Sequence, residues 1–217
     1  MLRLVSLAAA TFGLAACIPY AVGSTARTVP AGKHTKASTA FVIPNAFEVA
    51  GDSTAATMPG IDSELRYGID ASSDVGIRVP SWSGVVVNYK HRLDAVPASP
   101  AADTGVALSV MTGGGFVNWG EHAEGELSLL ASAREDRELV PYGGLRVVQV
   151  LPISRGAARD RPTAGGFVGL RIGRHDVSVA PELGLYYDHS ALGVRRGDLI
   201  VVPSITIRGG RLSSLLP

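Results

Sequence analysis

Polar and apolar residues alternate along most of this 217-residue chain, in short runs that are broken by clusters of Gly, Asp, Ser and Pro. Successive side chains of a β-strand point to opposite faces of a sheet, so each run has one apolar face and one polar face. In VSVAPELGLYYD (177–188), for example, Leu183 and Leu185 share one face, whereas Glu182 and Gly184 share the other. The pattern predicts an all-β protein built from antiparallel strands.

The number of such runs predicts a barrel. Equivalent alternation occurs in IDSELRYGID (61–70), DVGIRVP (74–80), VVVNYKHRLD (85–94), GGFVGLRIG (165–173) and LIVVPSITIRG (199–209), and further runs lie near 38–49, 104–117, 124–133 and 138–151. We therefore expect an antiparallel up-and-down β-barrel of about ten strands. If Pro80 merely bends one long strand, the number falls to about eight.

The polar faces combine long charged side chains with glycines. The charged residues are Glu64, Arg66, Arg78, Lys90, Arg92, Glu126, Arg146, Arg171, Glu182 and Arg208. A crowded lumen needs glycines to make room for guanidinium and carboxylate groups, whereas a solvated outer face does not. We therefore expect these residues to form a charge network in a polar lumen, where Arg–Glu pairs offset the cost of burial.

Alternation by itself is compatible with two kinds of barrel. A transmembrane barrel turns its apolar faces to lipid and its polar faces inward, and its strands need about 9–11 residues. A soluble periplasmic β-domain, tethered to the membrane and binding a ligand or partner, has the reverse arrangement. The charged, glycine-rich polar faces favour the transmembrane barrel.

The first residues have the features of a secretory signal peptide. Arg3 precedes the apolar run LVSLAAATFGLAA (4–16), which is too short to cross a bilayer as a helix. The sequence Leu14-Ala15-Ala16-Cys17 resembles the bacterial lipoprotein box, and Cys17 is the only cysteine in the chain. The resemblance implies cleavage before Cys17 and attachment of lipid, such as palmitate, to it. Because Ile18 rather than Asp follows, it also implies transport to the outer membrane.

This interpretation divides the chain into four parts: a signal peptide at 1–16, a lipidated flexible tether at 17–37, a barrel at 38–210 and a C-terminal tail at 211–217. As a whole, the chain resembles a small bacterial outer-membrane β-barrel protein that carries a lipoprotein signal. The resemblance implies insertion by the envelope assembly machinery. It also implies contact with membrane lipid through acylated Cys17 and the barrel exterior.

Charge and motifs suggest a function other than catalysis. Loss of the signal peptide removes Arg3 from 20 basic residues and leaves 19 against 19 acidic ones, so nothing indicates nucleic-acid binding. No pair of histidines has metal-ligand spacing among His34, His91, His122, His175 and His189.

We expect no enzyme activity, metal or cofactor. The expected role is structural or surface-interacting, with at most a narrow pore. A passive channel for small anions is one alternative, because seven of the ten predicted lumen residues are basic. A lipid-acting esterase that uses His189 and Ser190 at the barrel rim is another.

Overall fold

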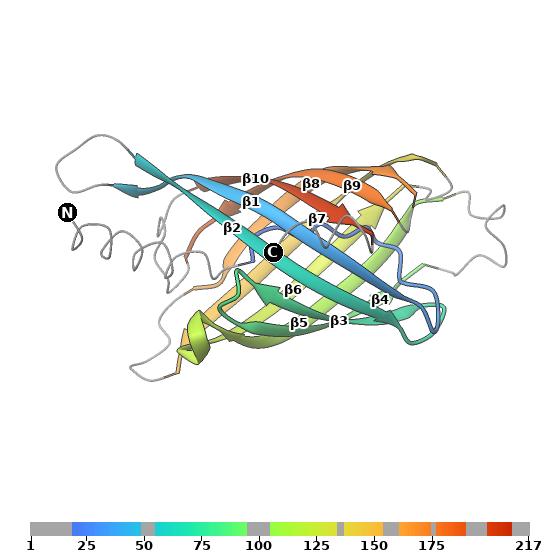
Figure 1. Ribbon diagram of the computed structural model, residues 1–217, viewed down its shortest axis with the longest axis horizontal. Coiled ribbons are helices and arrows are strands. Elements are labelled where there is room, and N and C mark those ends of the chain that lie inside the picture. The colour runs from blue at the N-terminus through green and yellow to red at the C-terminus, as the bar shows by residue number, and fades with distance from the viewer. Residues whose placement is uncertain are drawn as a thin grey trace.

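The computed structural model describes residues 19–48, 55–94, 105–133, 137–153, 161–174, 177–189 and 199–209. Ten antiparallel strands form a closed barrel in the order β1-β10-β9-β8-β7-β6-β5-β4-β3-β2 (Figure 1). The strands are β1 (His34–Glu48), β2 (Ala55–Gly68), β3 (Ser73–Pro80), β4 (Val85–Arg92), β5 (Ala107–Val117), β6 (His122–Ser132), β7 (Leu139–Pro152), β8 (Thr163–Gly173), β9 (Ser178–Tyr187) and β10 (Leu199–Arg208). A short 3-10 turn, η2 (Asn118–Gly120), lies between β5 and β6, and no helix in the described part of the chain is long and apolar enough to cross a membrane.

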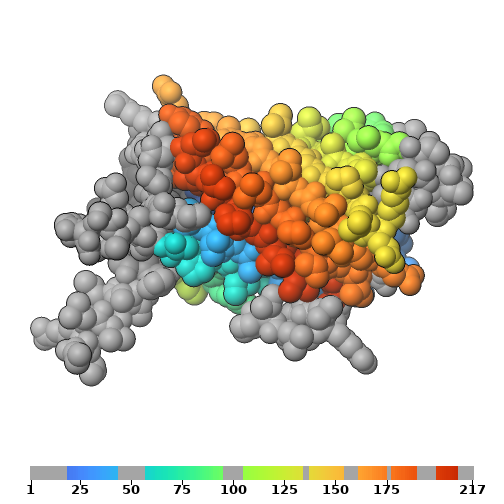
Figure 2. Space-filling view, turned by 90° about the horizontal axis from the view of Figure 1, so that it is seen from above, coloured from blue at the N-terminus to red at the C-terminus, as the bar shows by residue number. Residues whose placement is uncertain are grey.

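Each strand pairs with its neighbours in sequence, and β1 closes the barrel against β10. The closing ladder runs from Ala37 opposite Arg208 to Phe41 opposite Ser204, and Figure 2 shows the blue atoms of β1 beside the red atoms of β10. The prediction of an up-and-down barrel of about ten strands is confirmed. The eight-strand alternative is wrong, because Pro80 ends β3 and a separate strand, β4, begins at Val85.

The first two strands are longer than the sequence pattern predicts. β1 begins at His34 rather than at residue 38, and β2 begins at Ala55 rather than near 61. The two strands pair from His34 opposite Tyr67 to Glu48 opposite Ala55, with one register shift between Ile43 and Phe47. Small residues at the start of β2 weaken its alternation, so pairing with β1 rather than local pattern defines this part of the strand.

The apolar faces of the strands point outward. In β9, Leu183 and Leu185 are 49% and 47% exposed, whereas Glu182 and Tyr186, on either side of this pair in the sequence, are 5% and 1% exposed. The same alternation of exposed and buried residues runs along β4, β6 and β10. The barrel therefore has an apolar exterior and places most of its charged side chains inside.

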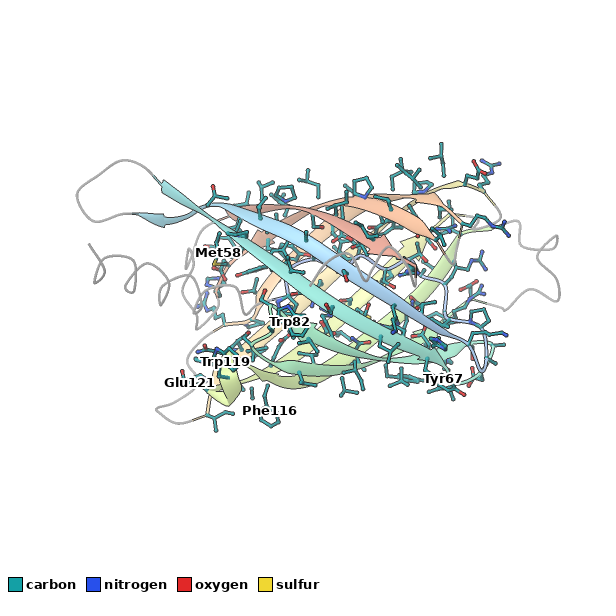
Figure 3. The ribbon with its side chains drawn as sticks, viewed as in Figure 1. Met58, Tyr67, Trp82, Phe116, Trp119 and Glu121 are labelled. Carbon is teal, nitrogen blue, oxygen red and sulfur yellow. The ribbon has the colours of Figure 1, made fainter. Side chains whose placement is uncertain are left out.

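The barrel has two ends, which we name by their connections. At the β1–β2 mouth lie the connections β1–β2, β3–β4, β5–β6, β7–β8 and β9–β10, and at the β2–β3 mouth lie the other four. Exposed aromatic side chains mark both ends: Figure 3 shows Trp82, Phe116 and Trp119 near the β1–β2 mouth and Tyr67 at the β2–β3 mouth.

Residues 19–29, which we call the inner segment, lie inside the barrel. All eleven are buried, and Figure 1 shows this dark-blue chain between the front and back walls. The sequence analysis expected a flexible tether at 17–37, so the structure differs there. The segment is fixed because its backbone polar groups find partners on the lumen wall.

Candidate functional site: the barrel lumen

The lumen wall carries all ten charged residues that the sequence analysis assigned to it. Nine are buried, and the side chain of the tenth, Glu64, is 11% exposed. Four further buried acids, Asp62, Asp74, Glu124 and Asp188, were not in the predicted set. Among the described wall residues, seven acidic side chains therefore accompany seven basic ones. Arg27 of the inner segment adds one more buried basic side chain, so the positive excess that suggested a channel for anions falls from four to one.

One group of wall charges centres on Arg66. Its Nη1 donates to Oε1 of Glu64 at 2.8 Å and to Oδ1 of Asn88 at 2.6 Å, and its other nitrogens bind Asp74. Gly76 makes this approach possible, because a Cβ there would lie 2.8 Å from Arg66 Nη1. The guanidinium is thus surrounded by acceptors, as a buried charge requires.

A second group centres on Glu126. Its Oε1 accepts a hydrogen bond from Arg78 Nη2 at 3.1 Å, and its Oε2 accepts one from Arg146. Gly113 opposes it across the β5–β6 ladder, and a Cβ at that position would lie 3.0 Å from Glu126 Oε1. Glycines in the inward rows therefore provide the space that the ion pairs occupy.

Of the remaining predicted residues, Lys90 joins the first group, because its Nζ lies 3.6 Å from Oδ2 of Asp74. Arg92 pairs with Asp94 at the end of β4, and Arg171 donates to the backbone carbonyl of Gly173 at 3.2 Å. Lys90, Glu182 and Arg208 have contacts with the inner segment. The structure thus resolves the single predicted network into separate clusters.

The first half of the inner segment is bound from β7 and β9. The two carboxyl oxygens of Glu182 accept hydrogen bonds from the backbone N–H groups of Val22 at 2.8 Å and Gly23 at 2.9 Å. Arg146 Nη1 donates to the carbonyl oxygen of Ala21 at 3.0 Å. The Tyr186 hydroxyl donates to the carbonyl oxygen of Tyr20 at 2.7 Å.

The second half is bound from β3, β4 and β6. Lys90 Nζ donates to the carbonyl oxygens of Thr25 at 3.2 Å and Arg27 at 2.6 Å. The backbone N–H of Val29 donates to Asp74 Oδ2 at 2.7 Å, so the acid that binds Arg66 also binds the segment. These contacts join backbone atoms to wall side chains, and they satisfy polar groups that would be costly to bury unpaired.

Apolar side chains of the segment enter two buried clusters. Tyr20 and Ala21 pack with inward residues near the β1–β2 mouth, including Met58 and Tyr186, and the Tyr20 and Tyr186 rings are 5.6 Å apart. Val22 and Ala26 belong to a second cluster, with Ala107, Met111, Leu130, Tyr142, Phe167 and Ala180. Apolar packing therefore supplements the polar contacts and fills the interior.

The sequence analysis missed the inner segment for a physical reason. Most of its residues are small, they lack strand periodicity, and its main partner, Glu182, is 160 residues from Val22 in the chain. Gly23 has a φ of 58° and a Cβ there would lie 2.1 Å from Thr206 Oγ1, so only glycine fits, but this requirement is visible only in the structure. The small residues of the inner segment, together with Gly23, allow the chain to fit inside a narrow barrel.

Several predicted sites fall elsewhere. Cys17, His175 and Ser190 lie outside the described residues. The backbone N–H of His189 donates to Thr163 Oγ1 at 3.1 Å, and its ring meets that of Tyr187 edge-on with centroids 4.6 Å apart. In the described part of the chain, no group of three or more His, Cys, Asp or Glu side chains is placed to hold a metal ion.

Three solved structures match this chain at low similarity, and one of them, OprG, is described as an outer membrane protein. Neisserial surface protein A is 12% identical, with a TM-score of 0.33, and the match covers 81% of this chain and 95% of that one. OprG from Pseudomonas aeruginosa is 10% identical, with a TM-score of 0.30 and coverage of 85% and 99%. Ail, the attachment invasion locus protein of Yersinia pestis, is 12% identical, with a TM-score of 0.27 and coverage of 82% and 97%. No protein-family model and no curated protein sequence matches the chain.

Proposed function

We propose that this protein is a lipid-anchored barrel of the bacterial outer membrane, that its own N-terminal segment closes it, and that its role is structural or surface-interacting. The observation that carries the proposal is an apolar exterior around a charged and filled lumen. Three arguments support it, from the exterior, the lumen and the N-terminal signal.

The exterior matches a lipid environment. The described strands and turns expose 28 large apolar side chains, far more than the scattered few of a soluble surface. In a bilayer these side chains contact apolar lipid chains, and closure of the barrel pairs each strand with a neighbour on both sides, so that no strand edge is left open. Exposed Trp82, Trp119 and Tyr67 suit the two membrane–water interfaces.

The lumen argues against passive conduction as the main activity. The inner segment occupies it, and the cavity beside Gly23, Tyr142, Arg171 and Arg208 has a volume of about 10 Å³, about the room that one water needs. Wall charges are balanced and largely paired with one another or with the segment. A filled and closed barrel therefore supports an interaction role for the rim and loops over a role in conduction.

Lipid attachment at Cys17 forms the second part of the proposal. The lipobox-like Leu14-Ala15-Ala16-Cys17 and the absence of a second cysteine support it. Each buried methylene contributes about 0.8 kcal/mol, so two acyl chains would hold the protein at the membrane without help. The barrel would add a second, independent anchor.

The two anchors can be separated by removing one of them. A Cys17→Ala variant, exported through an ordinary cleavable signal, cannot be acylated. Isolated outer membranes that carry it are washed with urea or with carbonate. Retention in the membrane fits an inserted barrel, whereas release as folded soluble protein would exclude insertion.

A charge on the exterior tests the same point by stability. Leu183 lies near the middle of β9 and is 49% exposed. Arginine at the bilayer midplane costs a transmembrane barrel about 2–4 kcal/mol, whereas an exposed surface substitution in water changes stability by about 0.5 kcal/mol or less. We expect Leu183→Arg to lower the free energy of unfolding measured in vesicles by about 2–4 kcal/mol, the cost at the bilayer midplane. Leu183→Ala is the matched control for lost side-chain volume, and equal effects of the two would contradict lipid contact.

A further inference from the structure

The direction of the inner segment relates the N-terminal end of the chain to one side of the barrel. Its first described residues lie near the β1–β2 mouth, where Tyr20 binds Tyr186, the next-to-last residue of β9. Its last residues lie at the β2–β3 mouth, where Thr28 Oγ1 donates to the carbonyl of Ala71 at 3.2 Å. The segment therefore crosses the lumen from one mouth to the other.

The chain then reverses direction. Gly32 N–H donates to the carbonyl of Gly68 at 2.9 Å, and β1 starts from this turn at His34 and runs back toward the β1–β2 mouth. Eleven extended residues reach at most about 36–40 Å, which suffices for an apolar core of about 30 Å. Residue 19 and residue 31 are thus at opposite ends of the barrel.

Covalent geometry limits where an anchor at Cys17 can attach. Consecutive Cα atoms are about 3.8 Å apart, so a residue two positions before Pro19 is within about 7.6 Å of it. We propose that the N-terminal attachment point of this protein lies at the β1–β2 mouth, on the opposite side of the membrane from the β2–β3 turn. The acyl chains then enter the leaflet that borders the exposed Trp82 and Trp119.

This inference rests on the proposed function for membrane insertion and lipid attachment, but it concerns a separate question: on which side of the membrane the lipid is attached. A tether outside the barrel would place Cys17 on the side where β1 starts, beside the β2–β3 turn. Passage through the lumen places it on the other side. The same wall contacts that close the barrel therefore determine which leaflet receives the lipid.

Two exposed positions serve as standards for the two sides. Asp70 lies in the β2–β3 turn, and Glu121 follows η2 at the β1–β2 mouth (Figure 3). Asp70→Cys and Glu121→Cys variants are labelled with a membrane-impermeant maleimide in intact cells and after permeabilisation of the outer membrane. Acylated Cys17 has no free thiol and does not react, so each variant reports one side.

The N-terminal side is read in the full-length protein by inserting a protease-specific sequence between Ile18 and Pro19. In intact cells we expect cleavage if Glu121→Cys is the variant that is labelled, and protection until permeabilisation if Asp70→Cys is the variant that is labelled. The opposite pairing in intact cells would overturn the inference. Mass spectrometry of the N-terminal peptide tests the lipid separately: an unmodified Cys17 would refute the lipid anchor, while the cleavage pattern would still decide the path of the chain.

Discussion

Replacing Glu182 by Gln tests whether wall side chains hold the inner segment in place. Glu182 is 5% exposed, and its two carboxyl oxygens accept hydrogen bonds from the backbone N–H groups of Val22 and Gly23 at 2.8 and 2.9 Å. Glutamine has nearly the same size but offers one oxygen and one NH₂ group. The backbone N–H of either Val22 or Gly23 therefore loses its acceptor and faces the NH₂ group of the glutamine, which is also a donor.

The size of the effect follows from these two mispaired groups. A buried donor without an acceptor costs about 1–3 kcal/mol, so two of them weaken docking of the segment by about 2–4 kcal/mol, allowing for some relaxation. Since 1.4 kcal/mol corresponds to about tenfold, the undocked population increases by about 30- to 700-fold. The interstrand ladder does not use this carboxyl group, so the barrel itself should stay closed.

Hydrogen exchange measured by mass spectrometry on the folded protein in membranes is the suitable assay. We expect faster exchange in peptides that contain Val22 and Gly23 and little change in peptides from the strands. Glu64→Gln is the matched control, because the carboxylate of Glu64 binds Arg66 and Asn88. Unchanged exchange of the segment in Glu182→Gln would refute the reasoning. Equal acceleration in both variants would show a general loosening of the lumen instead.

Three further predictions concern the turns. In Gly68→Ala, the added Cβ would lie 2.2 Å from the carbonyl oxygen of Pro30, so we expect a lower melting temperature in detergent micelles. The amide and hydroxyl of Ser72 hold the pKa of Asp70 below its usual 3.8, so this turn gains stability above the unfolded pKa and loses it as pH falls through the folded pKa. NMR titration of Ser72→Ala should show a higher pKa for Asp70, and hence loss of that stability at higher pH. Trp119 has a φ of 58°, so Trp119→Gly should relieve about 1 kcal/mol of backbone strain in micelle unfolding while weakening attachment to the interface in vesicles.

Local pattern was sufficient to predict the strands and their two faces. In β9 and β4, side chains that were assigned to the apolar face are exposed and those assigned to the polar face are buried. Gly113 and Gly76 lie beside buried charged groups, as the interpretation of lumen space requires. These features depend on neighbouring residues in one strand, and so they can be derived from the sequence.

Pairings across the lumen could not be predicted in the same way. Asp74 lies at the start of a strand, and nothing in its neighbourhood indicates that it binds both Arg66 and the backbone of Val29. Glu126 pairs with Arg78 and Arg146, which come from β3 and β7. Which charges meet depends on strand order, shear and closure, and these are properties of the whole barrel.

The sequence by itself determined that the protein is a β-barrel with one apolar and one polar face, because alternation with period two is a local consequence of strand geometry. The charged, glycine-rich polar faces favoured an apolar exterior, and the tertiary structure decided between the two orientations; only the tertiary structure placed residues 19–29 inside. An extended segment without periodicity has no preferred place of its own. Its position is fixed by wall groups such as Glu182 and Lys90, which closure of the barrel brings to its backbone from 160 residues and from 63 and 65 residues away, respectively.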